Sequence, residues 1–233
     1  TRPGERTDFS TVLTTDNTKT LYTGTEDGTT VYYFAGNATD NWVKFGGYYW
    51  RIIRTNADGS TRMLYHGTST TATDAYIGTS TFNSTYNDPM YVGYIYGTSN
   101  STAIDRSNTN NSTIKEVIDV WYKNNLNTNY GKYISTTAAY CNDRNVIDGT
   151  YNTSSFSYAG RTRLYSNKAP TYNCLTTEDK FTITGNIGNG KLTYPIALMT
   201  ADEISYAGGV YDKNSLTWYY YNSVKSSSTG SIN

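Results

Sequence analysis

Short aromatic and β-branched runs separated by turn residues are the feature of this sequence that most limits its fold. They occupy residues 31–34, 42–45, 48–54 and 61–65. Clusters of Gly, Asn and Asp separate these runs, which predicts antiparallel strands joined by tight turns. Within the third run, Trp50 and Ile52 share one phase of the alternation. We expect these two side chains to face the core, because one face of such a strand must bury its apolar set.

The rest of the composition is polar but carries few charges. The 233 residues include 19 Lys and Arg against 19 Asp and Glu, so the net charge is zero, and 25 residues are Tyr. A chain with zero net charge has no electrostatic footprint for nucleic acid. Few charges with many aromatic residues argue against a disordered chain, and scarce Ala, Leu, Glu and Lys argue against a coiled coil. The composition therefore favours a tyrosine-rich, β-dominated globular protein.

We expect three regions along the chain. Residues 1–30 are polar and rich in turn residues, and they predict an N-terminal arm or an edge strand. Residues 31–222 predict a single α+β domain, and residues 223–233 predict a flexible polar tail or a truncation point. The chain begins at Thr1 with neither Met nor a signal peptide, which predicts a mature or trimmed start. The longest apolar stretch, residues 194–199, is far shorter than the about 20 residues that span a bilayer, so we expect no direct membrane insertion by this segment.

Two capping boxes predict helices. Thr113 and Glu116 form a T-x-x-E pattern that leads into an apolar stripe, and they predict a helix of about three turns. Thr200 and Glu203 repeat the pattern and predict a second, short helix that stops at Gly208.

The remaining segments predict a hairpin and long loops. Residues 181–184 and 192–199 predict two strands of a hairpin around a glycine-rich loop, while residues 67–112 and 127–180 predict long loops. The fold class that we expect is α+β, mainly antiparallel β-sheet with two short helices and long loops. The side chains that we expect in its core are Trp42, Phe45, Trp50, Ile52, Leu64, Val117, Ile118, Trp121, Ile196 and Leu198.

Few residues offer reaction chemistry. His66 is the only histidine, and because it follows a predicted strand we interpret it as a solvated loop residue rather than a general base. Residues 185–191 match the phosphate-binding pattern G-x-x-x-x-G-K, but Leu192 lacks the hydroxyl that would hold magnesium. We interpret Asp202 and Glu203 as first-turn residues that favour the helix dipole. We therefore expect a protein that is not an enzyme, with no cofactor and no catalytic, cofactor-binding or metal site.

Cys141 and Cys174 are the only cysteines. An even count without a C-x-x-C motif favours one structural disulfide over a metal or redox site, and the alternative is two separate thiols in a cytosolic protein. Thr, Asn and Ser make up about a third of the chain. Such a composition, with many tyrosines, is typical of secreted bacterial surface proteins, so we expect a disulfide and an extracellular, cell-surface location.

Five runs of residues follow one another in order between residues 30 and 222. They are YYFAGNATDNWVKFGGYYWRIIRTNADGSTRMLYHG, FNSTYNDPMYVGYIYG, IKEVIDVWYKNNL, YCNDR and YPIALMTADEISYAGGVY. Their order and spacing resemble a family of largely uncharacterised secreted or pilin-like surface proteins of gut Firmicutes. That family is distantly similar to the C-type-lectin-like fold of formylglycine-generating enzymes.

The sequence departs from the family in two ways. The family continues into a Trp-x-x-Ser-Pro strand, and this sequence reaches Asn233 without one. The resemblance therefore implies a fold that lacks its last strand, either because the chain is truncated or because a neighbouring subunit supplies the strand. The copper-binding cysteines of formylglycine-generating enzymes also have no counterparts here, so no enzymatic activity is carried over.

Two functions follow as expectations. The first is a non-enzymatic extracellular surface protein with a lectin-like binding or adhesion module, because the expected scaffold displays long tyrosine-rich loops. Its partner would be a carbohydrate or a host or cell-surface protein. The partner would bind at the loops or at an aromatic ledge formed by Trp218, Tyr219, Tyr220 and Tyr221. The alternative interpretation of this ledge is ordinary sheet surface. The second is a structural subunit of a pilus-like surface filament, which binds copies of itself by self-association or strand donation.

Overall fold

The fold is available as a computed structural model. The residues that it describes are 3–13, 20–71, 75–84, 91, 93–97, 108–147, 158–185, 190–211 and 213. They belong to two compact units. The first unit comprises Thr1–Ile77, Arg163–Asn173 and Ala201–Asn233, and the second comprises Gly78–Thr162 and Cys174–Thr200. Because both units are built from segments that alternate along the chain, the single domain over residues 31–222 stays a prediction, and residues 223–233 lie outside the described part.

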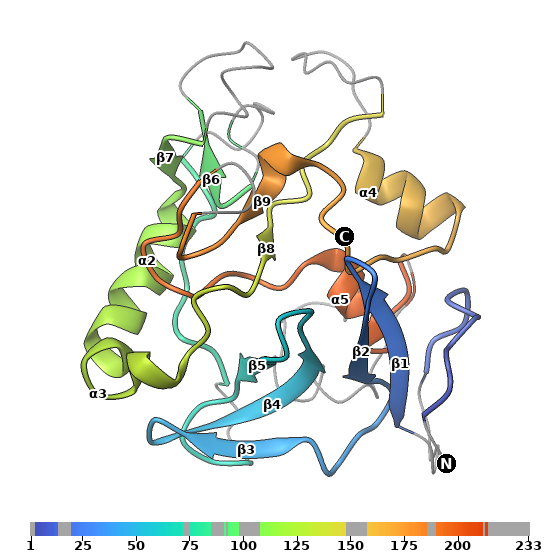
Figure 1. The fold of residues 1–233 in the computed structure, drawn as a ribbon, viewed down its shortest axis with the longest axis horizontal. Helices are drawn as coiled ribbons and strands as arrows, with labels where there is room; N and C mark the ends of the chain where they lie inside the picture. Colours follow the sequence, from blue (N-terminus) through green and yellow to red (C-terminus); the bar gives the residue numbers. More distant parts are fainter. Residues whose placement is uncertain are drawn as a thin grey trace. The chain divides into compact units, whose positions relative to one another are not determined.

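An antiparallel sheet forms the first unit (Figure 1). Its strands are β1 (Leu21–Glu26), β2 (Thr29–Phe34), β3 (Trp42–Phe45), β4 (Tyr48–Thr55) and β5 (Thr61–Tyr65). They run in the order β1-β2-β4-β3, and β5 also pairs with β4. The expected strands between residues 31 and 65 are therefore present, and the α+β class with mainly antiparallel sheet is confirmed.

A β-bulge in β4 changes which residues face the interior. Arg51 lies opposite Leu64, and Arg54 lies opposite Arg62, with a shift in register between Ile52 and Arg54. Residues two apart on β5 share one face, so Arg51 and Arg54, three apart on β4, also share a face. The expectation that Ile52 is buried is wrong, because the extra residue moves the buried apolar position to Ile53, which is 5% exposed. Trp50 is buried as expected.

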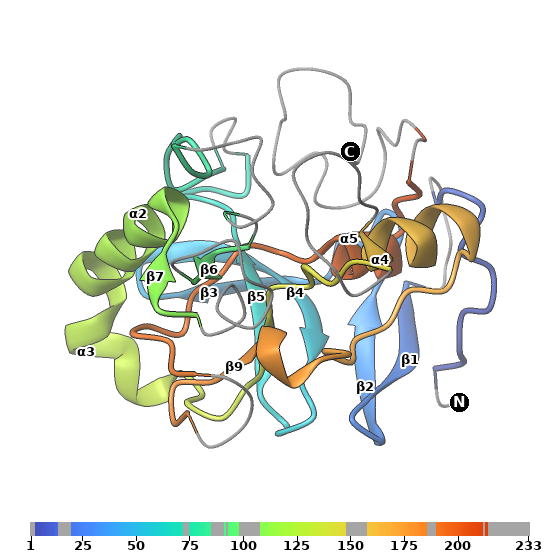
Figure 2. The same cartoon turned by 90° about the horizontal axis from the view of Figure 1, so that it is seen from above.

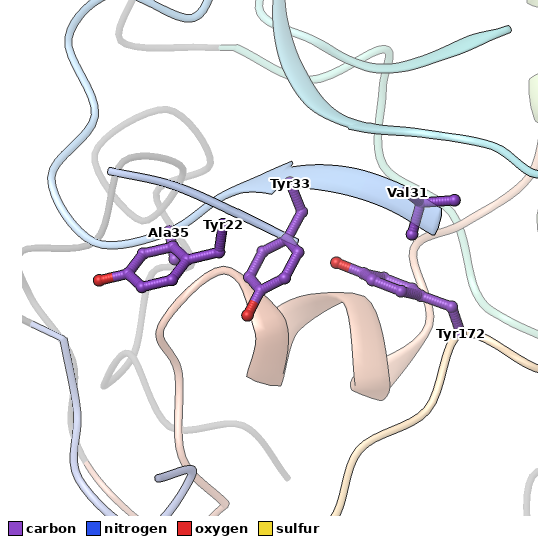
Figure 3. Close-up of a cluster of buried hydrophobic side chains, with 5 residues drawn as sticks. All are labelled: Tyr22, Val31, Tyr33, Ala35 and Tyr172. Carbon is purple, nitrogen blue, oxygen red and sulfur yellow. The ribbon is translucent and has the colours of Figure 1, made fainter. Parts of the chain in front are cut away.

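A tyrosine cluster fills the interior of the first unit. Its buried members are Tyr22, Val31, Tyr33, Ala35 and Tyr172, and Figure 3 shows their side chains between the strands and helix α5 (Ala201–Tyr206). Tyr22 stacks on Tyr33 with ring centroids 5.6 Å apart, and Tyr33 meets Tyr206 edge-on at 4.9 Å. Tyr172 stacks on Tyr206 at 3.9 Å. Aromatic pairs at these separations add stabilisation beyond the area that they bury.

Ion pairs lie beside this cluster. Arg54, which is 4% exposed, donates to Glu26 at 2.9 Å and to Glu203 at 3.2 Å. Arg62 donates to the same oxygen of Glu203 at 3.1 Å. Burial lowers the pKa of Arg54, but the carboxylates of Glu203 and Glu26 outweigh it, so the net shift is upward and the guanidinium stays charged. Asp202 and Glu203 lie in the first turn of α5, as predicted, and their carboxylates are also buried, where Asp202 binds Arg163.

Short elements make up the second unit, where α2 is followed directly by further helical turns up to α3 (Figure 2). Its strands are β6 (Ile95–Tyr96), β7 (Asn110–Asn111), β8 (Tyr140–Cys141) and β9 (Lys180–Phe181). Its helices are α2 (Thr113–Tyr122), a π-helical stretch (Lys123–Asn127), α3 (Thr128–Tyr130), α4 (Ala159–Arg161) and two 3-10 turns (Gly131–Tyr133 and Thr177–Asp179). A second π-helical stretch, Thr162–Ser166, follows α4 across the boundary into the first unit. The predicted disulfide between Cys141 and Cys174 is present and closes a sequence separation of 33 residues.

The two expected helices are present, with differences at their ends. Ser112, rather than Thr113, is the N-cap of α2, since its side chain accepts from the amide of Lys115. The helical path also extends beyond the three turns expected, because a π-helical stretch follows the ten residues of α2. The helical segment that begins with α4 lies in a part of the sequence expected to be a loop.

Other expectations are corrected by the second unit. Residues 181–184 and 192–199 do not form a hairpin: β9 pairs with β8, and Thr182 meets Lys191 in a single parallel bridge. Pro195, which has no amide proton, interrupts the second of these runs.

Among the expected core residues, Val117 and Leu198 are exposed, Trp50 and Ile118 are buried, and the rest are half-buried. Within the described part of the chain, no helix is long and apolar enough to cross a membrane.

Candidate functional site

The hairpin of β3 and β4 in the first unit carries an unusual concentration of aromatic and polar side chains. Trp42 lies opposite Arg51, and Lys44 lies opposite Tyr49, so these four side chains share one face of the hairpin. Lys44 is exposed, and Trp42 and Tyr49 are half-buried. Together with His66, which follows β5, we call these five residues the hairpin site.

Arg51 is the buried residue of the hairpin site against which Trp42 packs. Its guanidinium donates to the side-chain oxygen of Asn41 at 2.7 Å and to the carbonyl of Ala38 at 3.1 Å. Asn41 is itself fully buried and donates to the carbonyl of Ile52 at 3.0 Å. Two successive layers of hydrogen bonds therefore hold the guanidinium in one orientation.

Trp42 packs against the guanidinium of Arg51. The guanidinium carbon of Arg51 lies 3.5 Å from the centre of the indole ring, a cation–π contact, and the His66 ring lies edge-on to the indole with centroids 4.4 Å apart. Tyr49 meets the indole edge-on at 6.4 Å, and the ammonium of Lys44 lies 5.5 Å from the Tyr49 ring centre. The part of Trp42 that reaches the surface is thus rigidly placed next to an exposed cation.

His66 is buried, so the expectation of a solvated loop residue is wrong. It is 2% exposed, and its backbone amide donates to the carbonyl of Tyr49 at 2.9 Å. Its Nε2 lies 3.3 Å from the carbonyl of Thr70, and because a carbonyl only accepts, Nε2 carries the proton. Nδ1 is then a bare acceptor, and it has no hydrogen-bond partner among the described residues.

The charge state of His66 follows from these surroundings. Burial lowers the pKa of His66, and the neighbouring Arg51 cation lowers it further, although the hydrogen bond to Thr70 acts in the opposite direction. The imidazole is therefore neutral at pH 7 and serves as a packing surface for the indole. Among the described residues, the His66 ring faces an indole, a carbonyl and a guanidinium, which do not form the base and orienting carboxylate of a hydrolytic site.

The opposite face of the hairpin stiffens it. Trp50 donates its indole N–H to the carbonyl of Phe45 at 2.8 Å, which ties β4 to the end of β3. Tyr65 packs on Trp50 and Tyr48 with ring centroids 5.5 Å and 5.4 Å apart. The aromatic side chains on both faces therefore restrict the movement of the hairpin.

The residues expected to bind a ligand, Trp218, Tyr219, Tyr220 and Tyr221, lie outside the described residues. Sequence reasoning placed Trp42 in the core and did not identify the hairpin site. The available signal was the alternation of Trp42 and Lys44 with Tyr49 and Arg51 across a tight turn. Within the described part of the chain, no three His, Cys, Asp or Glu side chains are grouped so that they could hold a metal ion.

Comparison with known proteins finds no matching family model, curated protein or solved structure. The resemblance to pilin-like and C-type-lectin-like proteins therefore stays a prediction.

Proposed function

We propose that this protein is a non-enzymatic extracellular bacterial surface protein whose hairpin site binds carbohydrate. The observation that carries the proposal is the half-buried Trp42, which contacts Arg51 and His66 and shares a strand face with the exposed Lys44. The disulfide between Cys141 and Cys174 supports the extracellular location, because disulfides persist in oxidising compartments.

Rigid aromatic side chains suit a binding surface. Tyr and Trp offer large amphipathic contact areas and lose little conformational entropy when they bind. In the hairpin site that entropy is already lost, since Arg51 is fixed by Asn41 and Trp42 is fixed by Arg51. A sugar ring presents both C–H groups, which pack on aromatic rings, and hydroxyls, which accept from an ammonium such as that of Lys44. This pairing of an aromatic edge with an exposed donor favours carbohydrate over a purely apolar ligand.

The proposal is tested by screening the full chain on an array of bacterial cell-wall and host oligosaccharides, followed by titration calorimetry with the strongest ligand. Trp42→Ala should weaken binding by about 2 kcal/mol, roughly 30-fold in Kd, as for an aromatic anchor at a binding surface. Lys44→Ala, at an exposed position, should weaken binding less and leave the fold intact.

Tyr133→Ala is the matched control, because Tyr133 is an aromatic residue of the second unit that is 68% exposed. This variant should bind like the parent protein. An array without binding above background, or an equal loss in the Trp42 and Tyr133 variants, contradicts carbohydrate binding at the hairpin site and favours a protein partner.

A second role, a structural subunit of a surface filament, is favoured by a different observation. The outer edge of β1 is paired with an extended N-terminal segment, through the bridge between Glu5 and Thr23. An edge that accepts an extended segment can accept one from another subunit. Sedimentation velocity and electron microscopy of the purified chain test this role, which requires self-association.

A further inference from the structure

The N-terminal segment 3–13, which we call the arm, extends the sheet of the first unit. The amide of Thr23 in β1 donates to the carbonyl of Gly4 at 3.0 Å, and Glu5 pairs with Thr23 in a parallel bridge. The arm therefore occupies the outer edge of β1, where the backbone groups of an edge strand would otherwise lack strand partners.

Arg6 fixes the arm to helix α5. Its Nη1 donates to the carbonyls of Ser205 and Tyr206 at 3.0 Å and 3.2 Å, the last two residues of that helix. The Ser205 carbonyl also accepts from the amide of Gly208 at 3.1 Å, so Arg6 adds a second donor there, and a cation at this end interacts favourably with the helix dipole. The same guanidinium donates to the carbonyls of Asp8 and Thr11 at 2.9 Å and 3.3 Å, so it also holds the arm in its own bent shape.

Two apolar side chains complete the attachment. Phe9 packs edge-on against Tyr206 with ring centroids 5.2 Å apart. Leu13 packs against the tyrosine cluster, and its amide donates to the carbonyl of Gly208 at 3.1 Å. A Cβ at Gly208 would lie only 3.1 Å from the Cβ of Leu13, and glycine at this position leaves room for the arm. The outer edge of β1, the end of α5 and Gly208 therefore form a cradle for it.

The arm is attached without being part of the interior. Every residue from 3 to 13 is half-buried or exposed, whereas Tyr33 and Val31 beneath the cradle are almost fully buried. Most of the polar contacts of the arm with the cradle are made to backbone groups. Removing the arm would leave the buried cluster in place, and the arm could be released at a lower free energy than unfolding of the sheet.

We propose that the arm exchanges between copies of this protein, so that residues 3–13 of one copy occupy the cradle of a second copy. Seven residues, 14–20, lie in the sequence between the arm and β1. An exchanged arm makes the same contacts as an arm bound to its own chain, which makes exchange a low-cost route to association. Reciprocal exchange gives a closed dimer, and head-to-tail exchange gives an open filament. The inference rests on the second proposed role, self-assembly, and is independent of carbohydrate binding.

Two variants of the full chain, each with one cysteine added to the native disulfide pair, test the exchange. Glu5→Cys supplies a thiol on the arm, and Thr23→Cys supplies a thiol at the paired position in β1. The two variants are mixed, incubated at high protein concentration and mildly oxidised, and the products are resolved without reductant. Exchange predicts a covalent heterodimer of doubled mass. The matched control mixes Glu5→Cys with Lys44→Cys, an exposed position on β3, and should give none.

A third variant separates the outcomes. Glu5→Cys and Thr23→Cys combined in one chain should form an internal disulfide, visible by intact mass, if the arm binds as described. An internal disulfide without a heterodimer in the mixture overturns exchange, as does a heterodimer of equal yield in the control. No internal disulfide overturns the arm–cradle contact itself. If the parent chain self-associates in sedimentation while the mixture gives no heterodimer, the assembly role stands and the arm is not its means.

Discussion

The two units stabilise their interiors by different means. The first unit has four of its strands between four and six residues long and a fifth of eight, all in one antiparallel sheet, and its buried charges centre on Arg54. The second unit has strands of two residues and carries the disulfide between Cys141 and Cys174. Long backbone pairing therefore stabilises the first unit without a disulfide, whereas the second unit, which has little pairing, depends on contacts between side chains.

Buried ion pairs occur in both units, but they differ in how far apart their partners lie along the sequence. In the second unit, Lys115 binds Asp119 one helical turn away and the carbonyl of Ile196, and Arg144 binds Asp179 at 2.9 Å. Burial lowers the pKa of Lys115 and raises that of Asp119, while their mutual hydrogen bond opposes both shifts. In the first unit, Arg54 joins β1 to α5 through two carboxylates, and so it links distant parts of the chain.

The largest expected effect tests the ionic centre of the first unit. Arg54→Met leaves the carboxylates of Glu26 and Glu203 buried with a main partner missing, and should lower the free energy of unfolding by about 3–5 kcal/mol. Urea denaturation at pH 7 measures the change. Lys123→Met, which removes an exposed cation of the second unit, should change it by less than about 0.5 kcal/mol.

A further variant distinguishes lost pairing from lost packing. Combining Arg54→Met with Glu26→Gln and Glu203→Gln removes the uncompensated charges, so part of the lost stability should return. If the combined variant is less stable than Arg54→Met alone, packing around the guanidinium, and not charge compensation, is the dominant contribution.

The next effect tests the covalent link of the second unit. Replacing Cys141 and Cys174 by Ser releases a loop of 33 residues and should cost about 3–4 kcal/mol by the loop-entropy relation. Hydrogen exchange followed by mass spectrometry should show faster exchange in residues 110–145 and unchanged exchange in β1, β2 and β4. Equal acceleration in both units would contradict their different means of stabilisation.

The smallest effect concerns alkaline pH. Burial raises the pKa of Tyr33 well above its ordinary value near 10, so the folded chain keeps a proton that the unfolded chain has lost. Stability is then fully present below pH 10 and falls as pH rises further, by up to about 1.4 kcal/mol per pH unit for each such tyrosine. Burial likewise raises the pKa of Tyr206 in the first unit and of Tyr122 in the second, each to about 12.

Tyr33→Phe removes the contribution of Tyr33 to this decrease of stability with pH. The Tyr33 hydroxyl has no hydrogen-bond partner among the described residues, so its removal should leave stability at pH 7 unchanged or slightly higher. Denaturation at pH 8, 10 and 11 should show a shallower alkaline decline than in the parent chain. Parallel curves for the two proteins would mean that Tyr33 is not protected from ionisation by the fold.

Local patterns in the sequence predict the strands but not the ionic contacts. The runs around Trp42 and Trp50 carry strand propensity and turn residues within a few positions, and those strands are present. The partner of Arg54 in α5 is 149 residues away, and no local pattern connects the two. Glu203 lies in the first turn of α5, as its local pattern predicts, but that pattern gives no sign of the ion pair with Arg54.

The hairpin site was missed for a similar reason. An alternation of aromatic and charged residues across a turn predicts a strand pair, and it does not show that Arg51 is buried and held by Asn41. The burial of His66 depends on Trp42, 24 positions earlier, and a lone histidine after a strand carries no sign of such packing. The one local feature that argues against the expected hairpin of residues 181–184 and 192–199 is Pro195, which has no amide proton for strand pairing.

The extra residue in β4 has a consequence for how this chain tolerates change. A one-residue deletion at Ile53 would restore strict alternation and leave Arg54 opposite Arg62, on the same face as Arg51. Pairing Ile53 with Arg62 instead, without a deletion, would turn the Arg54 side chain to the other face, away from its two acidic partners. The position of the guanidinium therefore depends on the bulge, and an alignment of related chains can place a one-residue gap at position 53 without changing the face of either arginine.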